Sequence, residues 1–442
     1  MRPTYSLLFA SILVACGPSG SPAEGTDAGS GGGDDAGSGS DGGTGPGGCP
    51  ASYAGAACVI ALHDEAIDGC DTTVIAKLRG ELDARVKLGP LWAGGRALFR
   101  TDETMAIAGG FNNWLTTELQ TRAVCGTDLF VAVGAVGSGY WQYKLESVGT
   151  WMLDPHNPAF AYDDFSGNAD GKNSVLNTPD SGRGHVVTLD RACSSALDNC
   201  RDVTAYLPAG YASPVNASIT YPVLFMHDGQ NVWSDHDCCF GHTGWEIDTT
   251  LDAEISAHRV APVIVIAAAH SNARNNEYGL SVQAMQTFME FQVDELQPQA
   301  LAQVRWNQQR VAIAGSSLGG LVSMHLALSY PQTYSAVASL SGAFWPLQEI
   351  DHALRDRLPA YGKQPLAVYI DHGGNVGANS DGAADSVEVR DLMLGLGWQR
   401  SDSPSCTPSE TTLCYFNEPG ATHDELAWKA RAWRFLRYLF PS

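Results

Sequence analysis

The chain has 442 residues, of which 44% are hydrophobic and 9% aromatic, so a wholly disordered protein is excluded. Its 48 acidic residues outnumber its 26 basic ones and give a formal net charge of −22, which repels nucleic-acid phosphates and anionic lipid surfaces. We therefore expect no nucleic-acid partner, and the length suits two domains.

The N-terminus predicts an exported, lipid-anchored protein. Residues 1–16 place one arginine ahead of an apolar run too short to span a bilayer, as in a signal peptide. Leu13-Val14-Ala15-Cys16 resembles a bacterial lipobox, which implies lipidation of Cys16; an ordinary cleavable signal with an incidental cysteine is the alternative. Residues 17–48 are almost all small or acidic and predict a disordered linker. We expect this anchor to be the protein's contact with a membrane, facing the periplasm or the cell surface.

The other cysteines predict disulfides, because they are even in number in a chain expected to be exported: Cys49, Cys58, Cys70, Cys125, Cys193, Cys200, Cys238, Cys239, Cys406 and Cys414. The short spacings of Cys193 to Cys200 and of Cys406 to Cys414 favour local bridges. For the adjacent Cys238 and Cys239 we expect two different partners, with a bridge between them as the alternative. The Cys and His spacings are not typical of a metal site, and we expect neither metal nor organic cofactor.

Residues 49–182 are predicted to form a small β-sandwich domain with a helical segment at its start. A helix is expected to begin near Asp71-Thr72 and to pack on the sandwich through aliphatic residues at helical spacing: Val74, Ile75, Leu78 and Leu82. From about 98 to 178 the chain shows short alternating strands separated by turn residues.

Two segments of this region resemble a known family. Gly110-Phe111-Asn112-Asn113-Trp114 and the run from Trp151 to Pro158 resemble the early-set, immunoglobulin-like modules related to glycogen-binding modules. Trp114, Tyr143 and Trp151 could then stack on a sugar ring. The alternative is that these rings fill the core of the sandwich and brace the neighbouring domain.

Residues 183–442 are predicted to form an α/β-hydrolase domain with a doubly wound sheet. Apolar strand-like runs alternate with helical segments, as expected for strands covered on both faces: 185–190, 202–208, 221–227, 260–269, 310–315, 336–342 and 365–373.

A candidate nucleophile lies in this domain. Gly315-Ser316-Ser317-Leu318-Gly319 matches the G-x-S-x-G pattern of a nucleophile elbow, although the pentapeptide alone is weak in a chain with 48 glycines, where it could be a small-residue turn. Its context is stronger, because an apolar strand precedes it and a helical segment follows. We therefore predict Ser317 as the nucleophile.

A nucleophilic serine needs a base, and in α/β hydrolases the chain order is serine, acid, histidine. His423 follows a Pro-Gly turn and precedes an amphipathic terminal helix, where the loop after the last strand would place that base. His227 and His372 also lie at strand ends but fit an oxyanion or lining role better. We predict His423 as the base.

The acid is expected in the loop after the strand that ends near residue 372. Asp371 is still within the strand end, and Asp385 to Glu388 resembles a helix capping box. Asp381 is therefore the predicted acid, with Asp385 as the alternative.

The oxyanion hole is expected from the backbone amide of Leu318, which follows the nucleophile, and from that of Gln230 or a neighbour. Five further residues are candidates to line the acyl or alcohol pocket, with core packing or helix docking as the alternative for each: Glu277, Trp233, Trp245, Trp345 and Trp428.

Several motifs in the C-terminal half occur in the order of a known family: YPVLFMHDGQNVW, RNNEYGL, VDELQP, GSSLGGLVS, SLSGAFW and PGATHDELAW. Together they resemble the esterase family of α/β hydrolases that includes enterochelin esterases, feruloyl esterases and S-formylglutathione hydrolase. The resemblance covers residues 184–442 and implies Ser317 as nucleophile, His423 as base and Asp381 as acid. An early-set domain ahead of the hydrolase is also similar to the enterochelin-esterase arrangement.

We therefore predict a serine carboxylic-ester hydrolase that works through an acyl-enzyme. Its substrate would be a small-molecule or polysaccharide-linked ester, such as a catecholate siderophore or a feruloylated or acetylated polysaccharide. A serine acyltransferase with the same triad and a catalytically inactive glycan-binding surface lipoprotein are the alternatives.

Overall fold

The computed structural model describes residues 44–163, 171–235, 238–239, 243–345 and 354–442. The predicted signal, Cys16 and nearly all of the predicted linker lie outside the described residues. Within the described ranges, no helix combines the length and the apolar composition needed to cross a bilayer.

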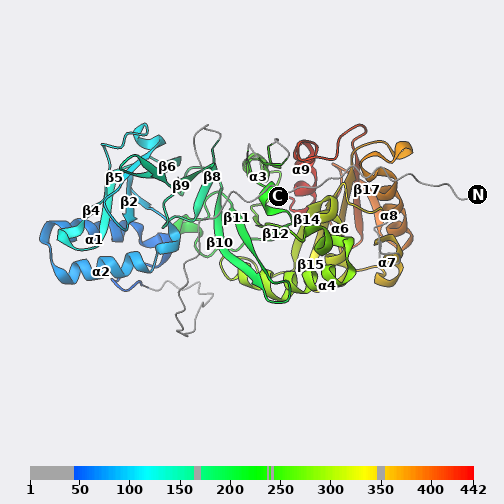
Figure 1. Ribbon diagram of the computed structural model, residues 1–442, viewed down its shortest axis with the longest axis horizontal. Helices are drawn as coiled ribbons and strands as arrows, with labels where there is room; N and C mark the ends of the chain where they lie inside the picture. The colour runs from blue at the N-terminus through cyan, green and yellow to red at the C-terminus, as the bar shows by residue number, and fades with distance from the viewer. Residues whose placement is uncertain (1–43, 164–170, 236–237, 240–242, 346–353) are drawn as a thin grey trace, which may run out of the picture.

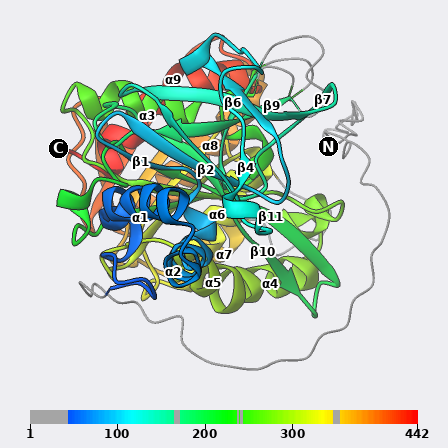
Figure 2. The ribbon, with the colours of Figure 1, turned by 90° about the vertical axis from the view of Figure 1, so that its left-hand side faces the viewer.

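The N-terminal half begins with two helices packed on a four-stranded sheet. The helices are α1 (Ala56–Gly69) and α2 (Thr72–Asp83), and the sheet has the order β1-β2-β5-β4, with bounds Leu91–Ala93, Arg96–Thr101, Phe130–Ala135 and Arg122–Ala123. Viewed from this end of the molecule, the helices lie below β1 and β2 (Figure 2). A shared core joins α2 to the sheet through Ile75, Leu78, Leu98 and Val131.

The predicted helix after Asp71 is confirmed. The Asp71 carboxylate caps α2 by accepting hydrogen bonds from the amides of Thr73 and Val74, at 2.7 and 3.3 Å. The preceding helix α1 was not predicted, because its run AACVIAL has the composition of a buried strand as much as that of a helix.

A second group of N-terminal strands continues into the main sheet. These strands are β3 (Ala106–Gly109), β6 (Tyr140–Ser147), β7 (Thr150–Met152), β8 (Ala159–Tyr162) and β9 (Lys172–Asn177). β8 pairs antiparallel with β10 (His185–Ser194), with Phe160 opposite Val186 and Ala159 opposite Val187. One hydrogen-bonded sheet therefore runs through both halves of the molecule (Figure 1).

The three aromatic residues considered for sugar stacking differ in their surroundings. Tyr143 is fully buried and its hydroxyl donates to Asp154 Oδ2 at 2.6 Å, so it belongs to the core and cannot stack on a sugar. Trp114 and Trp151 are 40% and 43% exposed, and their ring centroids are 6.4 Å apart. The N-terminal half is mostly sheet, as predicted, while its immunoglobulin-like kinship stays a prediction.

The C-terminal half contains the parallel part of the sheet. In the described part of the chain the 14-stranded sheet has the order β17-β18-β16-β15-β14-β12-β13-β11-β10-β8-β9-β6-β3, with β7 beside β6. The remaining bounds are β11 Asn199–Leu207, β12 Val223–Met226, β13 Ile264–Ala268, β14 Val311–Ser316, β15 Tyr334–Leu340, β16 Ala367–His372, β17 Gln399–Asp402 and β18 Thr412–Asn417. Strands β12 to β18 pair parallel, so their carboxyl ends share one edge.

Helices cover both faces of this parallel sheet, which confirms the predicted doubly wound α/β class (Figure 1). On one face lie α4 (Val282–Phe291), α5 (Gln297–Leu301), α6 (Ser317–Ser329), α7 (Leu354–Tyr361) and α8 (Ala383–Gly395). On the other lie α3 (Ile247–Ser256) and α9 (Glu425–Leu439). Each face encloses its own hydrophobic core, so the strands are buried on both sides.

The described cysteines form five disulfides. Cys193–Cys200 and Cys406–Cys414 are the local bridges that the spacing predicts. Cys49–Cys58 and Cys70–Cys125 belong to the N-terminal half. The expectation of separate partners for Cys238 and Cys239 is wrong, because the structure joins these two neighbours to each other.

Candidate active site

Ser317 lies in a sharp turn between a buried strand and a helix. β14 ends at Ser316 and α6 begins at Ser317, whose φ of 53° is in the left-handed region that non-glycine residues seldom adopt. A Cβ on Gly315 would lie 2.5 Å from the carbonyl carbon of Gly319, so only glycine fits where the strand and the helix meet. This is the backbone of a nucleophile elbow.

His423 and Asp381 meet at the same edge of the sheet. Asp381 lies in the loop after β16 and His423 in the loop after β18, and these strands are parallel neighbours with His372 opposite Asn417. The Nδ1 atom of His423 is 2.5 Å from Oδ1 of Asp381. The Asp381 side chain is 2% exposed and that of His423 is 28% exposed, so the imidazole alone reaches solvent.

Asp381 is held as a carboxylate. Burial by itself would raise its pKa, but the hydrogen bond and charge of His423 lower that pKa below its ordinary value, assisted by the Ser341 hydroxyl and the Gly373 amide. An ionised Asp381 can only accept, so the hydrogen bond assigns a proton to His423 Nδ1. Nε2 of the neutral ring is then the basic nitrogen.

The loop that carries Gln230 packs against the first turn of α6. The amide of His227 donates to the carbonyl oxygen of Ala314 at 3.0 Å, and a Cβ on Gly319 would lie 3.1 Å from Oδ2 of Asp228. Gln230 itself is in a short 3-10 turn, Gly229–Asn231, and its Oε1 accepts from the His270 amide at 3.2 Å. Leu318 is the second residue of α6.

The alternative acid, Asp385, has partners other than the imidazole. It accepts a hydrogen bond from Asn379 Nδ2 at 2.9 Å and lies 3.9 Å from the Arg355 guanidinium. The predicted capping box is wrong, because α8 begins at Ala383 with Gly382 as its N-cap, and Asp385 is already inside the first turn.

The other histidines at strand ends are enclosed in the protein. His227 is buried between the rings of Tyr278 and Phe288, at centroid distances of 5.2 and 5.7 Å, and burial lowers its pKa to about 4. The ring nitrogens of His372 lie 2.6 Å from the Tyr415 hydroxyl and 2.7 Å from the Gly373 carbonyl.

Two of the five candidate lining residues lie beside His423. The rings of Trp345 and Trp428 have centroids 6.2 and 5.1 Å from that of the imidazole. Trp428 is also buried in the core, as are the other three: Trp233 donates to Thr204, Trp245 packs on Trp428, and Glu277 forms a buried ion pair with Arg201 at 2.8 Å.

The sequence did not assign a role to Ser341 or Arg431. Ser341 follows β15 and donates a hydrogen bond to Asp381 Oδ2 at 2.7 Å. Arg431 is on α9, is 1% exposed, and lies 3.9 Å from the same oxygen. The sequence did contain a signal for Arg431, because an arginine on the inward face of an amphipathic helix needs a buried anionic partner.

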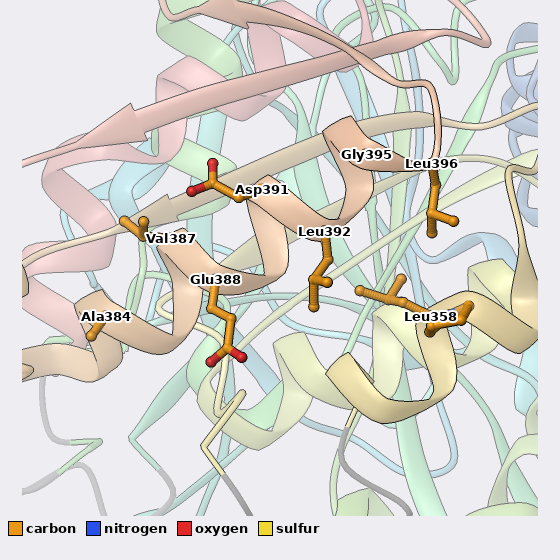
Figure 3. Close-up of a pocket in the computed structure, with 9 residues that line it drawn as sticks. Leu358, Ala384, Val387, Glu388, Asp391, Leu392, Gly395 and Leu396 are labelled. Carbon is orange, nitrogen blue, oxygen red and sulfur yellow. The ribbon is translucent and has the colours of Figure 1, made fainter.

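Two cavities of the described residues are lined by neither Ser317 nor Asp381 nor His423. An apolar groove of about 650 Å³ lies between α7 and α8, and its lining includes Leu358, Val387, Glu388 and Leu392 (Figure 3). A cavity of about 800 Å³ lies between the two halves, near Phe160 and Tyr211.

The strand order and the left-handed serine between β14 and α6 define an α/β hydrolase. The family described as "Putative esterase" matches residues 194–430, more than half of the chain, and the chain belongs to this family.

Two curated relatives are similar to this chain. The chain is 29% identical over 183 residues to an iron(III) enterobactin esterase of Dickeya dadantii, covering 39% of this chain and 36% of that protein. It is 27% identical over 261 residues to an endo-1,4-beta-xylanase/feruloyl esterase of Xylanibacter ruminicola, covering 56% of this chain and 30% of that protein. The chain thus spans about a third of the length of these curated relatives.

Among solved structures, the enterobactin esterase of Shigella flexneri is similar over 79% of this chain and 96% of that chain, with 15% identity and a TM-score of 0.43. Because that score is low, the fold assignment rests on the strand order and register of this chain.

Proposed function

We propose that the protein is a serine carboxylic-ester hydrolase with Ser317 as nucleophile, His423 as general base and Asp381 as the acid. The observation that carries the proposal is the 2.5 Å contact between His423 Nδ1 and Asp381 Oδ1, at the edge of the sheet where Ser317 occupies a left-handed turn. Membership of the esterase family supports the same reaction class.

In this mechanism Nε2 of His423 takes the proton of the Ser317 hydroxyl as Oγ attacks the ester carbonyl carbon. The amides of Leu318 and Gln230 would stabilise the resulting oxyanion, and the loss of one oxyanion-hole donor typically costs about 3 kcal/mol of transition-state stabilisation. The C–O bond to the alcohol then breaks, and His423 returns the proton to the leaving oxygen. Water, deprotonated by His423, attacks the acyl-enzyme and releases the carboxylic acid and free Ser317.

The relatives named above support a choice of substrates to examine. One acts on iron(III) enterobactin and another is named as a feruloyl esterase, so we propose catecholate siderophore esters and feruloylated or acetylated carbohydrates as the first substrates to examine. The partly exposed ring of Trp345 beside His423 suits an aromatic acyl or alcohol group.

The test uses purified full-length protein with p-nitrophenyl esters, a panel of feruloyl, acetyl and catecholate esters, and a fluorophosphonate probe. We expect p-nitrophenol release and covalent labelling in the wild type. Replacing the nucleophile in Ser317→Ala should abolish labelling and lower kcat by about 10⁶-fold without changing the melting temperature. The neighbouring Ser316→Ala is the matched control and should retain activity, whereas activity that survives in Ser317→Ala would refute the assignment.

The predictions for the N-terminus remain part of this proposal. We propose that Cys16 is lipidated, that residues 17–48 form a linker, and that residues 49–182 and 183–442 are the two domains. Metabolic labelling with an alkyne fatty acid, compared between wild type and Cys16→Ser, tests the anchor.

A further inference from the structure

The carboxylate of Asp381 has hydrogen-bond partners from outside its own loop. Asp381 has a φ of 57°, and Asn379 and Gly382 on either side have φ of 47° and 62°, so this stretch of backbone is in a conformation that L residues disfavour. Besides His423, its carboxylate accepts from the Gly373 amide and from the Ser341 hydroxyl, both through Oδ2.

The hydroxyl of Ser341 has one possible orientation. Its oxygen accepts a hydrogen bond from Trp428 Nε1 at 3.0 Å and another from Arg431 Nη2 at 2.6 Å. Indole and guanidinium nitrogens can only donate, so both lone pairs of the oxygen are occupied. The single hydroxyl hydrogen must then point at the third neighbour, Asp381 Oδ2, 2.7 Å away.

Arg431 is in turn held by Asp371. Its Nε lies 3.0 Å from Asp371 Oδ1, both side chains are at most 1% exposed, and the Tyr369 hydroxyl donates to Asp371 Oδ2 at 3.0 Å. The backbone amide of Ser341 also donates to the Asp371 carbonyl, at 2.9 Å. A buried chain of contacts therefore leads from β16, through Arg431 on α9, to the hydroxyl that faces the acid.

On the assumption that the proposed function holds, we propose that Ser341 is a positioning residue. Trp428 and Arg431 fix its hydroxyl, which holds Oδ2 of Asp381 so that Oδ1 faces His423. Since α9 begins two residues after His423, the same helix places the base and, through Arg431 and Trp428, orients the acid.

The experiment compares wild type with Ser341→Ala in the full-length chain. We expect kcat to fall about 10- to 100-fold with little change in KM, well short of the roughly 10⁴-fold loss that follows replacement of a triad acid by its amide. Losing a donor to Asp381 makes its carboxylate more basic and stabilises the imidazolium, so the acidic limb of kcat/KM should move to higher pH. A merely structural defect would lower the rate equally at all pH values.

The matched control is Ser386→Ala, which truncates another fully buried serine whose hydroxyl has no hydrogen-bond partner among the described residues. It should leave kcat and the pH profile unchanged. If Ser341→Ala does not fold, Trp428→Phe removes one of the two donors that fix the hydroxyl, and the same shift of the acidic limb is expected.

A second readout is the downfield proton resonance of His423 Nδ1, which reports the contact with Asp381 whether or not an ester is turned over. Its movement or loss in Ser341→Ala supports the proposal. The proposal would be overturned if Ser341→Ala kept the wild-type kcat, the wild-type acidic limb and the wild-type position of this resonance. If instead folded wild type neither hydrolyses any ester nor reacts with the fluorophosphonate, the proposed function fails while the resonance still tests the positioning role.

Discussion

The two halves of the molecule share one sheet but place their strained backbone differently. In the C-terminal half, three neighbouring parallel strands end at a non-glycine residue with positive φ. Ser317 directly follows β14, Ser341 directly follows β15, and Asp228 follows β12 after one intervening residue. In the N-terminal half such residues lie in scattered turns, as at Asn113 and Val148. Glu246, His258 and Gln308 also have positive φ in the C-terminal half, so what distinguishes the carboxyl edge is that three neighbouring strands end in this way at the candidate site.

The halves also differ in how they are stabilised. The C-terminal half buries both faces of its sheet under helices, whereas the N-terminal half has two smaller cores and the disulfide with the largest sequence separation, Cys70–Cys125 at 55 residues. A small core gains more from a covalent link because it buries less apolar surface per residue. Changes at the sheet edge should therefore affect catalysis, and changes in the N-terminal half should affect stability.

After replacement of the nucleophile itself, replacement of the acid should have the largest effect. Asp381→Asn keeps the shape of the side chain but removes the carboxylate that sets the His423 tautomer, so kcat should fall by about 10⁴-fold. Asp385→Asn is the matched control in the same region, and its kcat should stay within about twofold of wild type. The kcat values of the two variants are compared by steady-state kinetics on a p-nitrophenyl ester. A larger loss in Asp385→Asn than in Asp381→Asn would make Asp385 the acid.

The next effect is confined to stability. Replacing both Cys70 and Cys125 by serine frees a loop of 55 residues and should lower the free energy of unfolding of the N-terminal half by about 2–4 kcal/mol. Removing Cys193–Cys200, which closes 7 residues, should cost less. Urea unfolding followed by tryptophan fluorescence gives the stabilities. A parallel loss of kcat in the Cys70 and Cys125 variant, under conditions where it is folded, would contradict the separation of roles.

The last effect depends on pH and concerns the junction of the halves. His185, at the start of β10, is buried, and burial lowers its pKa from 6.5 to about 4. The unfolded chain therefore binds a proton between these values that the folded chain does not, so stability falls as the pH decreases from 6.5 to 4. One such histidine contributes a slope of about 1.4 kcal/mol per pH unit.

His185→Gln should therefore lose less stability than wild type between pH 6.5 and pH 4.5, as measured by urea unfolding at several pH values. Equal slopes for the two proteins would show that His185 is protonated as readily in the folded state as in the unfolded state.

Sequence reasoning reached the candidate triad because each member has a local signature. Ser317 has glycines on both sides of a strand-to-helix turn, and His423 follows the last strand. Asp381 was reached by elimination, partly on a capping box that the structure does not contain. The adjacent cysteines and α1 were misjudged for a common reason: short apolar or cysteine-containing runs fit two local structures, and only neighbours distant in sequence decide between them.

By itself the sequence determined the alternation of strands and helices, the turn around Ser317 and the order of the reactive residues, because these depend on hydrophobic period, glycine and chain position. Only the tertiary structure decided that Ser341 faces Asp381 across 40 residues of sequence and that Arg431 reaches Ser341 across 90. It also decided that the N-terminal strands extend the hydrolase sheet. Such contacts depend on which buried donors and acceptors the packed helices and strands bring within hydrogen-bond distance, and no local pattern records that.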